Sequence, residues 1–311
     1  MAASAHGNLS EKRLVIFGCG YVGAALAKEA RGHGVQVTAL TRNRDKAAVL
    51  RAEGITAVEA ELASETWHPA IPGGADFVVN CVSSGGGGLE NYRRSYVDGL
   101  RSILTWARRA PVGTLVFTSS TSVYPQDGGR WVDESCSTAG TSGLPAVLRE
   151  AEQLLQDIPR LREDGASLPA CQRWFILRLA GIYGPGRHHL LDQLRRGEAR
   201  LAGKGDHRLN LAHRDDIVAA IWAALTADAA VAGEIFNVAD GNPATRAEIA
   251  GWLAACLQQA TPSFTGEAMP GRRAVTPDRM ISSAKITARL GWQPRYPDFR
   301  RGYADVLAGG G

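Results

Sequence analysis

The sequence predicts an α/β fold in which a doubly wound parallel sheet carries a smaller C-terminal lobe. Short apolar runs alternate with helical patterns as far as residue 179, and a glycine-rich turn follows the first run. A stretch rich in Gly and Pro at 181–187 then breaks this rhythm. Apolar runs between helices are typical of parallel strands covered on both faces. Their repetition indicates a doubly wound sheet.

The expected elements follow in order along the chain. Strands are predicted over residues 13–17, 35–40, 55–59, 75–82, 113–118, 174–179 and 234–238. Helices are predicted over 21–31, 45–53, 90–109, 146–156, 213–225 and 244–259, and 261–277 is expected to be a loop. The predicted organisation is therefore a flexible tail over 1–12, a main domain over 13–180 completed by about 207–238, and a substrate-binding lobe made of 181–206 and 239–311.

Composition limits the class of protein. Of 311 residues, 45% are hydrophobic and 21% are charged, which suits a sizeable core. The formal net charge of +4 is spread along the chain, so we expect no nucleic-acid partner. Five widely spaced cysteines predict reduced thiols in a cytoplasmic protein. Neither a secretory signal nor an apolar stretch of membrane-spanning length is found, so no membrane partner is expected.

A glycine motif lies between the first predicted strand and the first predicted helix. Residues 18–23 read Gly-Cys-Gly-Tyr-Val-Gly. In this position the pattern indicates a Rossmann-type dinucleotide site. Gly18 permits a tight turn, Gly20 lets the backbone approach a pyrophosphate, and Gly23 lets the helix pack closely on the strand. The helix N-terminus offers free N–H groups to the phosphates. The predicted cofactor contacts are Gly18, Gly20, Tyr21, Val22 and Gly23.

The residues at the end of the second predicted strand bear on the choice between NADP(H) and NAD(H). Residues 40–44 read Leu-Thr-Arg-Asn-Arg, without an acidic residue to hold a ribose 2′-hydroxyl. Arg42, with Arg44 behind it, is suited to charge-assisted bonds with a 2′-phosphate. We therefore favour NADP(H); if these arginines only solvate a loop, NAD(H) stays open. Further expected contacts are Thr41 and, near the adenine amino group, Glu61 and Leu62.

Several further segments resemble one family. Residues 117–124 (Phe-Thr-Ser-Ser-Thr-Ser-Val-Tyr) resemble the "SSxxVYG" segment of extended short-chain dehydrogenases/reductases, the group of sugar-nucleotide epimerases and dehydratases. Residues 177–186 resemble their "LRxxxxYGPG" segment, and 210–217 their "FxHVxD" segment. Residues 236–238, followed by Gly241, resemble their "YNVG" strand. These motifs occur in the family's order, and the resemblance runs from about residue 13 to 291.

The chain departs from this family at its acid/base pair. The resemblance implies a Tyr followed four residues later by a Lys, but none of the seven tyrosines here has this neighbour. Aligning Glu152 with the family's helix glutamate places Leu144 and Leu148 at the two positions. Leucine cannot transfer a proton. The chain therefore resembles atypical members that lack the pair, which makes epimerase or dehydratase chemistry the less expected activity.

The resemblance also supplies substitutes for the missing pair. Ser120 matches the serine that polarises the substrate oxygen, Ser122 a substrate-contacting neighbour, and Ser119 is expected beside the cofactor. The alternative is a loop serine that bonds its own backbone. Tyr124 is a candidate proton donor, or else packs as structure.

A second set of candidates follows the Gly-Pro-Gly turn. Arg187 can grip an anionic substrate group, and His188 can carry a proton. The alternative is a helix start with solvent-facing histidines. No third ligand accompanies His188 and His189 at a recognised spacing, so we predict no metal site.

Two functions fit this pattern. The first is an NADP(H)-dependent oxidoreductase acting on a small carbonyl or sugar-like substrate, with the proton from Tyr124, His188 or water. The second is a non-catalytic dinucleotide-binding sensor or partner-binding protein, which would explain the missing pair. The resemblance further implies a homodimer formed through the helices 90–109 and 146–156.

Overall fold

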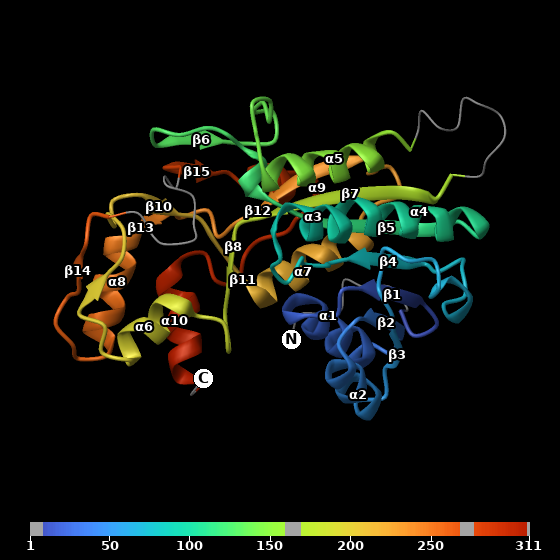
Figure 1. Cartoon of the computed structure of the whole chain (residues 1–311), viewed down its shortest axis with the longest axis horizontal. Helices are drawn as coiled ribbons and strands as arrows, with labels where there is room; N and C mark the ends of the chain where they lie inside the picture. Colours follow the sequence, from blue (N-terminus) through green and yellow to red (C-terminus); the bar gives the residue numbers. More distant parts are fainter. Residues whose placement is uncertain (1–8, 159–168, 268–276, 310–311) are drawn as a thin grey trace. The chain divides into compact units, whose positions relative to one another are not determined.

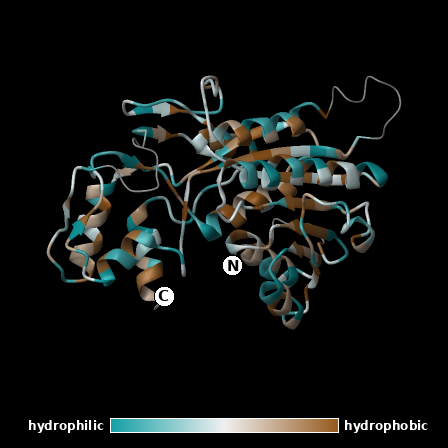
Figure 2. Cartoon of the chain, viewed as in Figure 1, coloured by the Kyte–Doolittle hydropathy of each residue, from teal (hydrophilic) through white to brown (hydrophobic). Residues whose placement is uncertain are grey.

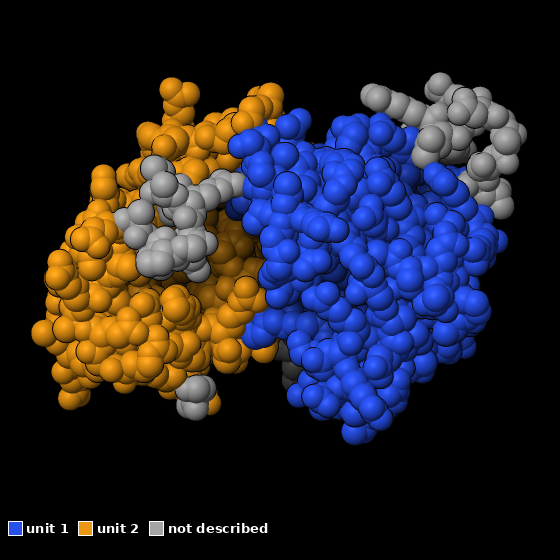
Figure 3. All heavy atoms as spheres, in the orientation of Figure 1, with its two compact units in different colours: residues 1–123, 141–178, 218–236 blue, residues 124–140, 179–217, 237–311 orange. Residues whose placement is uncertain are grey.

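The computed structural model describes residues 9–158, 169–267 and 277–309. The chain forms two compact units, coloured separately in Figure 3. The first unit comprises Met1–Val123, Thr141–Arg178 and Val218–Phe236. The second unit comprises Tyr124–Gly140, Leu179–Ile217 and Asn237–Gly311.

A seven-stranded sheet forms the centre of the first unit (Figure 1). Its order is β12-β7-β5-β4-β1-β2-β3. The strands are β1 (Arg13–Phe17), β2 (Gln36–Thr41), β3 (Thr56–Glu59), β4 (Phe77–Asn80), β5 (Val112–Ser120), β7 (Cys171–Leu179) and β12 (Glu234–Val238). The pairings that join β1 to β2 and β4, β2 to β3, and β4 to β5 are parallel. The predicted α/β doubly wound fold is therefore confirmed.

The order of strands contains a reversal. The chain passes from β1 through β2 to β3 at one edge, then returns to β4 on the other side of β1. The carboxyl ends of β1 and β4 consequently lie side by side where the winding changes direction. Open α/β sheets bind ligands at such a switch point, since the loops there diverge and leave a crevice.

Helices connect these strands. They are α1 (Tyr21–Gly32), α2 (Arg44–Ala52), α3 (Gly88–Arg93), α4 (Gly99–Arg109), α5 (Leu144–Gln156) and α7 (Arg214–Leu225), the last of which spans the boundary between the units. The single helix predicted over 90–109 is α3 and α4 joined by a π-helical turn at Arg94–Asp98. The apolar strands form the core, with Leu14–Phe17 of β1 buried throughout, and they appear brown in Figure 2.

The second unit is built from helices and short strand pairs. Its helices are α6 (His189–Arg195), α8 (Arg246–Cys256), α9 (Ala284–Leu290) and α10 (Phe299–Ala308). Its strand pairs are β6–β15 (Arg130–Val132, Arg279–Ile281), β8–β11 (Gly181–Tyr183, Leu211–His213), β9–β14 (Arg200–Leu201, Ser263–Phe264) and β10–β13 (Arg208–Leu209, Ala244–Thr245). Leucines of α6 pack against α8 and against Phe299 and Tyr303 of α10.

The structure corrects several of the sequence-based elements in the second unit. The helices α9 and α10 were not predicted, and α6 was foreseen only in the alternative of a helix start after the Gly-Pro-Gly turn. The helix expected over 244–259 is limited to Arg246–Cys256. The expected loop 261–277 contains the strand β14, and its residues 268–276 lie outside the described part of the chain.

The N-terminal segment is only partly described. Residues 1–8 of the predicted tail lie outside the described residues. Leu9 is buried, and Lys12 forms an ion pair of 2.8 Å with Asp76, so residues 9–12 are attached to the sheet. Within the described ranges, every helix is too short or too polar to traverse a bilayer.

Candidate functional site

The glycine turn after β1 needs two of its three glycines for steric reasons. Gly18 has φ +87°, and a Cβ there would lie 2.5 Å from the Cα of Val82. A Cβ at Gly23 would lie 2.6 Å from the carbonyl oxygen of Gly18, so α1 packs directly on the turn. A Cβ at Gly20 would meet no atom within 4 Å. Gly20 therefore borders open space, into which a ligand can approach the backbone closely.

A pocket of about 250 Å³ opens at the switch point between β1 and β4. We call it the switch-point pocket. Its lining comes from residues 18–20, 40–43, Lys46, 60–62, 81–83, Gly85 and Ser95. It thus brings together the segments that follow four neighbouring strands, all within the first unit.

The pocket contains six of the predicted cofactor contacts. Those that line it are Gly18, Gly20, Thr41, Arg42, Glu61 and Leu62. Tyr21, Val22 and Gly23 lie just beyond the turn, in the first residues of α1. Arg44 begins α2 and is exposed, but is not among the lining residues.

Lys46 lines the pocket, and the sequence did not single it out. Asn43 caps α2, because its side chain accepts a hydrogen bond of 2.8 Å from the Lys46 N–H. Helical side chains lean toward the N-terminus of their helix, which brings the Lys46 side chain back to the end of β2. There it joins Arg42, whose Nη2 donates to the Ser84 carbonyl at 2.9 Å. Two cations therefore border the pocket on its β2 side.

Glu61 and Leu62 border the pocket beyond β3. Glu61 is half-buried, whereas Leu62 is buried and packs near Gly99 of α4. Among the described residues, no hydrogen bond uses the Leu62 N–H. This corner therefore offers a carboxylate acceptor and a backbone donor from adjacent residues.

The serines at the end of β5 have different partners. Ser119 donates a hydrogen bond of 2.6 Å to Glu152, and Arg178 binds both carboxylate oxygens of Glu152 at 3.0 and 2.6 Å. All three side chains are buried, so the Ser119 hydroxyl belongs to an interior ion pair. The Ser120 oxygen accepts a hydrogen bond of 3.1 Å from the Ser122 N–H, as expected for a loop serine.

The positions of the family's acid/base pair lie at the start of α5. Leu144 is its first residue and is exposed, whereas Leu148 is buried one turn later. Glu152 follows after a further turn. Neither leucine has a polar side-chain atom, so neither can give or take a proton.

The remaining candidates lie in the second unit. The Tyr124 hydroxyl is buried and donates to Asn237 Oδ1 at 2.9 Å. His188 is buried, and its Nδ1 lies 2.7 Å from Asp192 Oδ1. This distance suits an ion pair, but the angles between the two groups do not suit a hydrogen bond. Arg187 and His189 are exposed. The alternative of solvent-facing histidines therefore holds for His189 and is wrong for His188.

The second unit also buries titratable groups that were not among the predicted site residues. Burial raises the pKa of Asp240 to about 8, and repulsion from Asp298 and Asp216 acts in the same direction. Burial lowers the pKa of His213 and raises the pKa of Tyr183. The rings of these two residues meet edge to face, with their centroids 5.3 Å apart. These groups are therefore held in their neutral forms near pH 7.

Comparisons with known proteins extend these observations. The model of the NAD dependent epimerase/dehydratase family matches residues 14–239. The chain is 31% identical to Protein YeeZ of Escherichia coli K12 over 294 residues, which cover 92% of this chain and 97% of that protein. It is 27% identical to the 2-alkyl-3-oxoalkanoate reductase of Stenotrophomonas maltophilia, over 79% of this chain and 76% of that protein.

A solved structure supports the fold. The structure of MoeE5 in complex with UDP-glucose and NAD superposes with a TM-score of 0.78 at 20% identity, covering 95% of this chain and 97% of that one. The family model spans the glycine turn, every segment that lines the switch-point pocket and the last strand of the sheet. The chain therefore belongs to the NAD dependent epimerase/dehydratase family.

Proposed function

We propose that this protein is an NADP(H)-dependent oxidoreductase acting on a small carbonyl or sugar-like substrate. The observation that carries the proposal is the pair of cations, Arg42 and Lys46, on the β2 side of the switch-point pocket. A ribose 2′-phosphate is doubly ionised or nearly so at neutral pH, and charge-assisted bonds to it are about twice as strong as neutral ones. A ribose 2′-hydroxyl would instead call for a carboxylate at the end of β2.

The pocket suits the rest of the dinucleotide. The open space at Gly20 and the N-terminus of α1 suit a pyrophosphate. Adenine presents an amino donor beside a ring-nitrogen acceptor, which complements the Glu61 carboxylate and the Leu62 N–H. When bound, a nicotinamide ring supplies or accepts the hydride.

Ser120 is the residue that we assign to the substrate oxygen. Its bond with the Ser122 N–H uses one lone pair of the hydroxyl oxygen and leaves the O–H hydrogen available. In the part of the chain that the structure describes, no other partner takes that hydrogen. The relative named 2-alkyl-3-oxoalkanoate reductase supports reduction of a carbonyl group. Water is the proton source that we favour, since the Tyr124 proton is directed to Asn237.

A second candidate function has its own support. Leu144 and Leu148 lack any proton to transfer, and the Tyr124 hydroxyl is buried against Asn237. These observations favour a protein that binds the dinucleotide without turnover, as a redox sensor or a partner-binding module. It would bind NADPH tightly, oxidise none against any carbonyl, and change its affinity for a partner on binding.

Fluorescence titration with NADPH and NADH tests the cofactor, and NADPH oxidation against a carbonyl panel then separates the two functions. We expect Arg42→Glu to lower the ratio of NADPH to NADH affinity by about tenfold or more, because a charged hydrogen bond contributes about 1.5–3 kcal/mol. Arg108→Glu, an exposed change of equal charge in α4, is the control and should keep the ratio. An unchanged ratio in Arg42→Glu would remove the case for NADP(H).

A further inference from the structure

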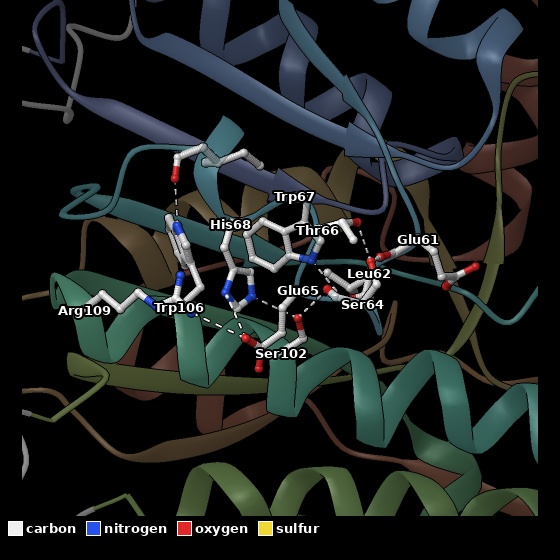
Figure 4. A network of polar contacts seen from close by, with 11 residues as sticks. Glu61, Leu62, Ser64, Glu65, Thr66, Trp67, His68, Ser102, Trp106 and Arg109 are labelled. Atoms are coloured by element: carbon white, nitrogen blue, oxygen red, sulfur yellow. Dashed lines mark hydrogen bonds and ion pairs between the residues drawn. The ribbon is translucent and has the colours of Figure 1, made fainter.

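The wall of the switch-point pocket beyond β3 is fixed by side-chain hydrogen bonds (Figure 4). The Glu61 carbonyl accepts from the Ser64 hydroxyl at 2.9 Å, and the Leu62 carbonyl accepts from Trp67 Nε1 at 3.0 Å. The Ser64 carbonyl accepts from the Ser102 hydroxyl of α4 at 2.9 Å. Side chains therefore hold three backbone carbonyls within four residues. One of these side chains, that of Ser102, comes from a separate helix, α4.

His68 stands at the end of this chain of bonds. Its Nε2 lies 3.1 Å from the Ser102 hydroxyl oxygen. The Ser64 carbonyl can only accept, so Ser102 uses its single hydrogen there and must accept from the His68 ring. His68 is therefore the Nε2–H tautomer, and its ring is buried edge to face against Trp67 at 4.3 Å.

Two charged side chains face His68 from the elements around it. Glu65 Oε2 lies 3.9 Å from Nδ1, and Arg109 of α4 lies 3.4 Å from the same carboxylate oxygen. Burial and the charge of Arg109 lower the pKa of His68. The ring is consequently neutral near pH 7, with one hydrogen, which it directs to Ser102.

We propose that His68 is a positioning residue for the nucleotide pocket, which acts through Ser102 and Ser64 to orient the Glu61–Leu62 corner toward adenine. The inference rests on the dinucleotide function proposed above. In a trans peptide the C=O and N–H groups point in opposite directions. Holding the Glu61 carbonyl therefore also fixes the direction of the Leu62 N–H, the donor that adenine requires.

The test uses a base whose edge is reversed. Hypoxanthine carries an acceptor oxygen and a ring N–H where adenine carries a donor and an acceptor. We expect the unmodified protein to prefer NADPH over its hypoxanthine analogue in fluorescence titrations. His68→Phe keeps the aromatic volume but removes the donor, and should reduce this preference about five- to tenfold, the value of one net hydrogen bond.

Two further variants separate positioning from packing. In His68→Gln the amide nitrogen reaches the place of Nε2, so the preference should be retained. In His68→Asn it reaches only the place of Nδ1, so the preference should fall. Trp292→Phe is the control for the loss of a buried hydrogen bond, because it removes the bond of 3.1 Å from Trp292 Nε1 to the Asp216 carbonyl in the second unit. This control should keep the preference.

The outcomes are distinct. Equal weakening of both dinucleotides in His68→Phe, with their ratio intact, would show a purely structural role and overturn the inference. Equal affinity of the unmodified protein for the two dinucleotides would overturn it while leaving dinucleotide binding in place. Binding of neither would overturn both proposals. If His68→Phe does not fold, Ser102→Ala breaks the same chain and must reduce the preference in its place.

Discussion

Gly18 and Gly20 stand two positions apart in one turn, yet a methyl group on each would meet different surroundings. At Gly18 it would collide with the backbone of Val82 at a positive φ, whereas at Gly20 it would enter open space. We expect Gly18→Ala to lower the free energy of unfolding by about 2 kcal/mol or more. Gly20→Ala should leave stability within about 1 kcal/mol but weaken NADPH binding about tenfold, because the methyl group takes the space of the pyrophosphate.

Urea unfolding and fluorescence titration of both variants check this contrast. Gly291→Ala is a useful third variant, because Gly291 also has a positive φ, lies outside the pocket and leaves room for a methyl group. It should lose stability through backbone strain alone and bind NADPH normally. Normal nucleotide binding by Gly20→Ala would place the pyrophosphate elsewhere.

Local sequence predicts the positions of some residues of the switch-point pocket but not of others. The glycine turn and Arg42 were predicted from spacing because each follows a strand directly. Lys46 needed the geometry of α2, since only a helix that starts at Arg44 brings this side chain back to the pocket. The bonds from His68 through Ser102 needed the contact between α4 and the segment after β3, which no local pattern contains.

For helices and strands, too, the local sequence predicts only part of the structure. The strands of the sheet were predicted because apolar runs of about four to eight residues have the length of a strand and are too short for a typical helix. The helix α10 was missed because Gly302 lies inside it, and glycine weakens a helical pattern. The structure gives the reason for that glycine: a Cβ at position 302 would overlap the ring of Tyr183. Close packing between α10 and β8 therefore outweighs local helix propensity.

One buried ion pair connects three elements of the first unit. Glu152 of α5 binds Arg178 of β7 and accepts from Ser119 at the end of β5. We expect Glu152→Gln to lower the free energy of unfolding by about 3–5 kcal/mol, because it leaves the Arg178 charge buried without a counter-ion. Urea unfolding checks this value. Glu150→Gln, on the same helix but in exposed ion pairs with Arg93 and Arg101, should cost less than about 1 kcal/mol.

The double variant Glu152→Met, Arg178→Met distinguishes charge from packing. Replacing both partners of a buried pair by apolar side chains is often neutral or stabilising. We therefore expect the double variant to be more stable than Glu152→Gln. A double variant as unstable as the single one would mean that the shapes of these side chains, rather than the uncompensated charge, account for the loss.

One buried carboxyl group should have a large effect on how the stability of the whole chain depends on pH. Asp240 is buried in the second unit, where burial and two neighbouring carboxylates raise its pKa to about 8. The folded protein keeps this proton up to about pH 8, whereas an unfolded chain releases it near pH 4. The native state therefore binds more protons between these values, and its free energy of unfolding falls as the pH rises.

We expect Asp240→Asn to remove this dependence, since the amide is neutral at every pH. The variant and the unmodified protein should have similar stability near pH 4.5. The variant should become the more stable one as the pH approaches 8, with the full shift worth on the order of 5 kcal/mol. Urea unfolding at several pH values gives the difference, and Asp45→Asn, an exposed carboxyl of α2, controls for net charge. A difference that stays constant with pH would mean that Asp240 is already ionised in the folded protein, and that the interior of the second unit solvates a charge that its burial should exclude.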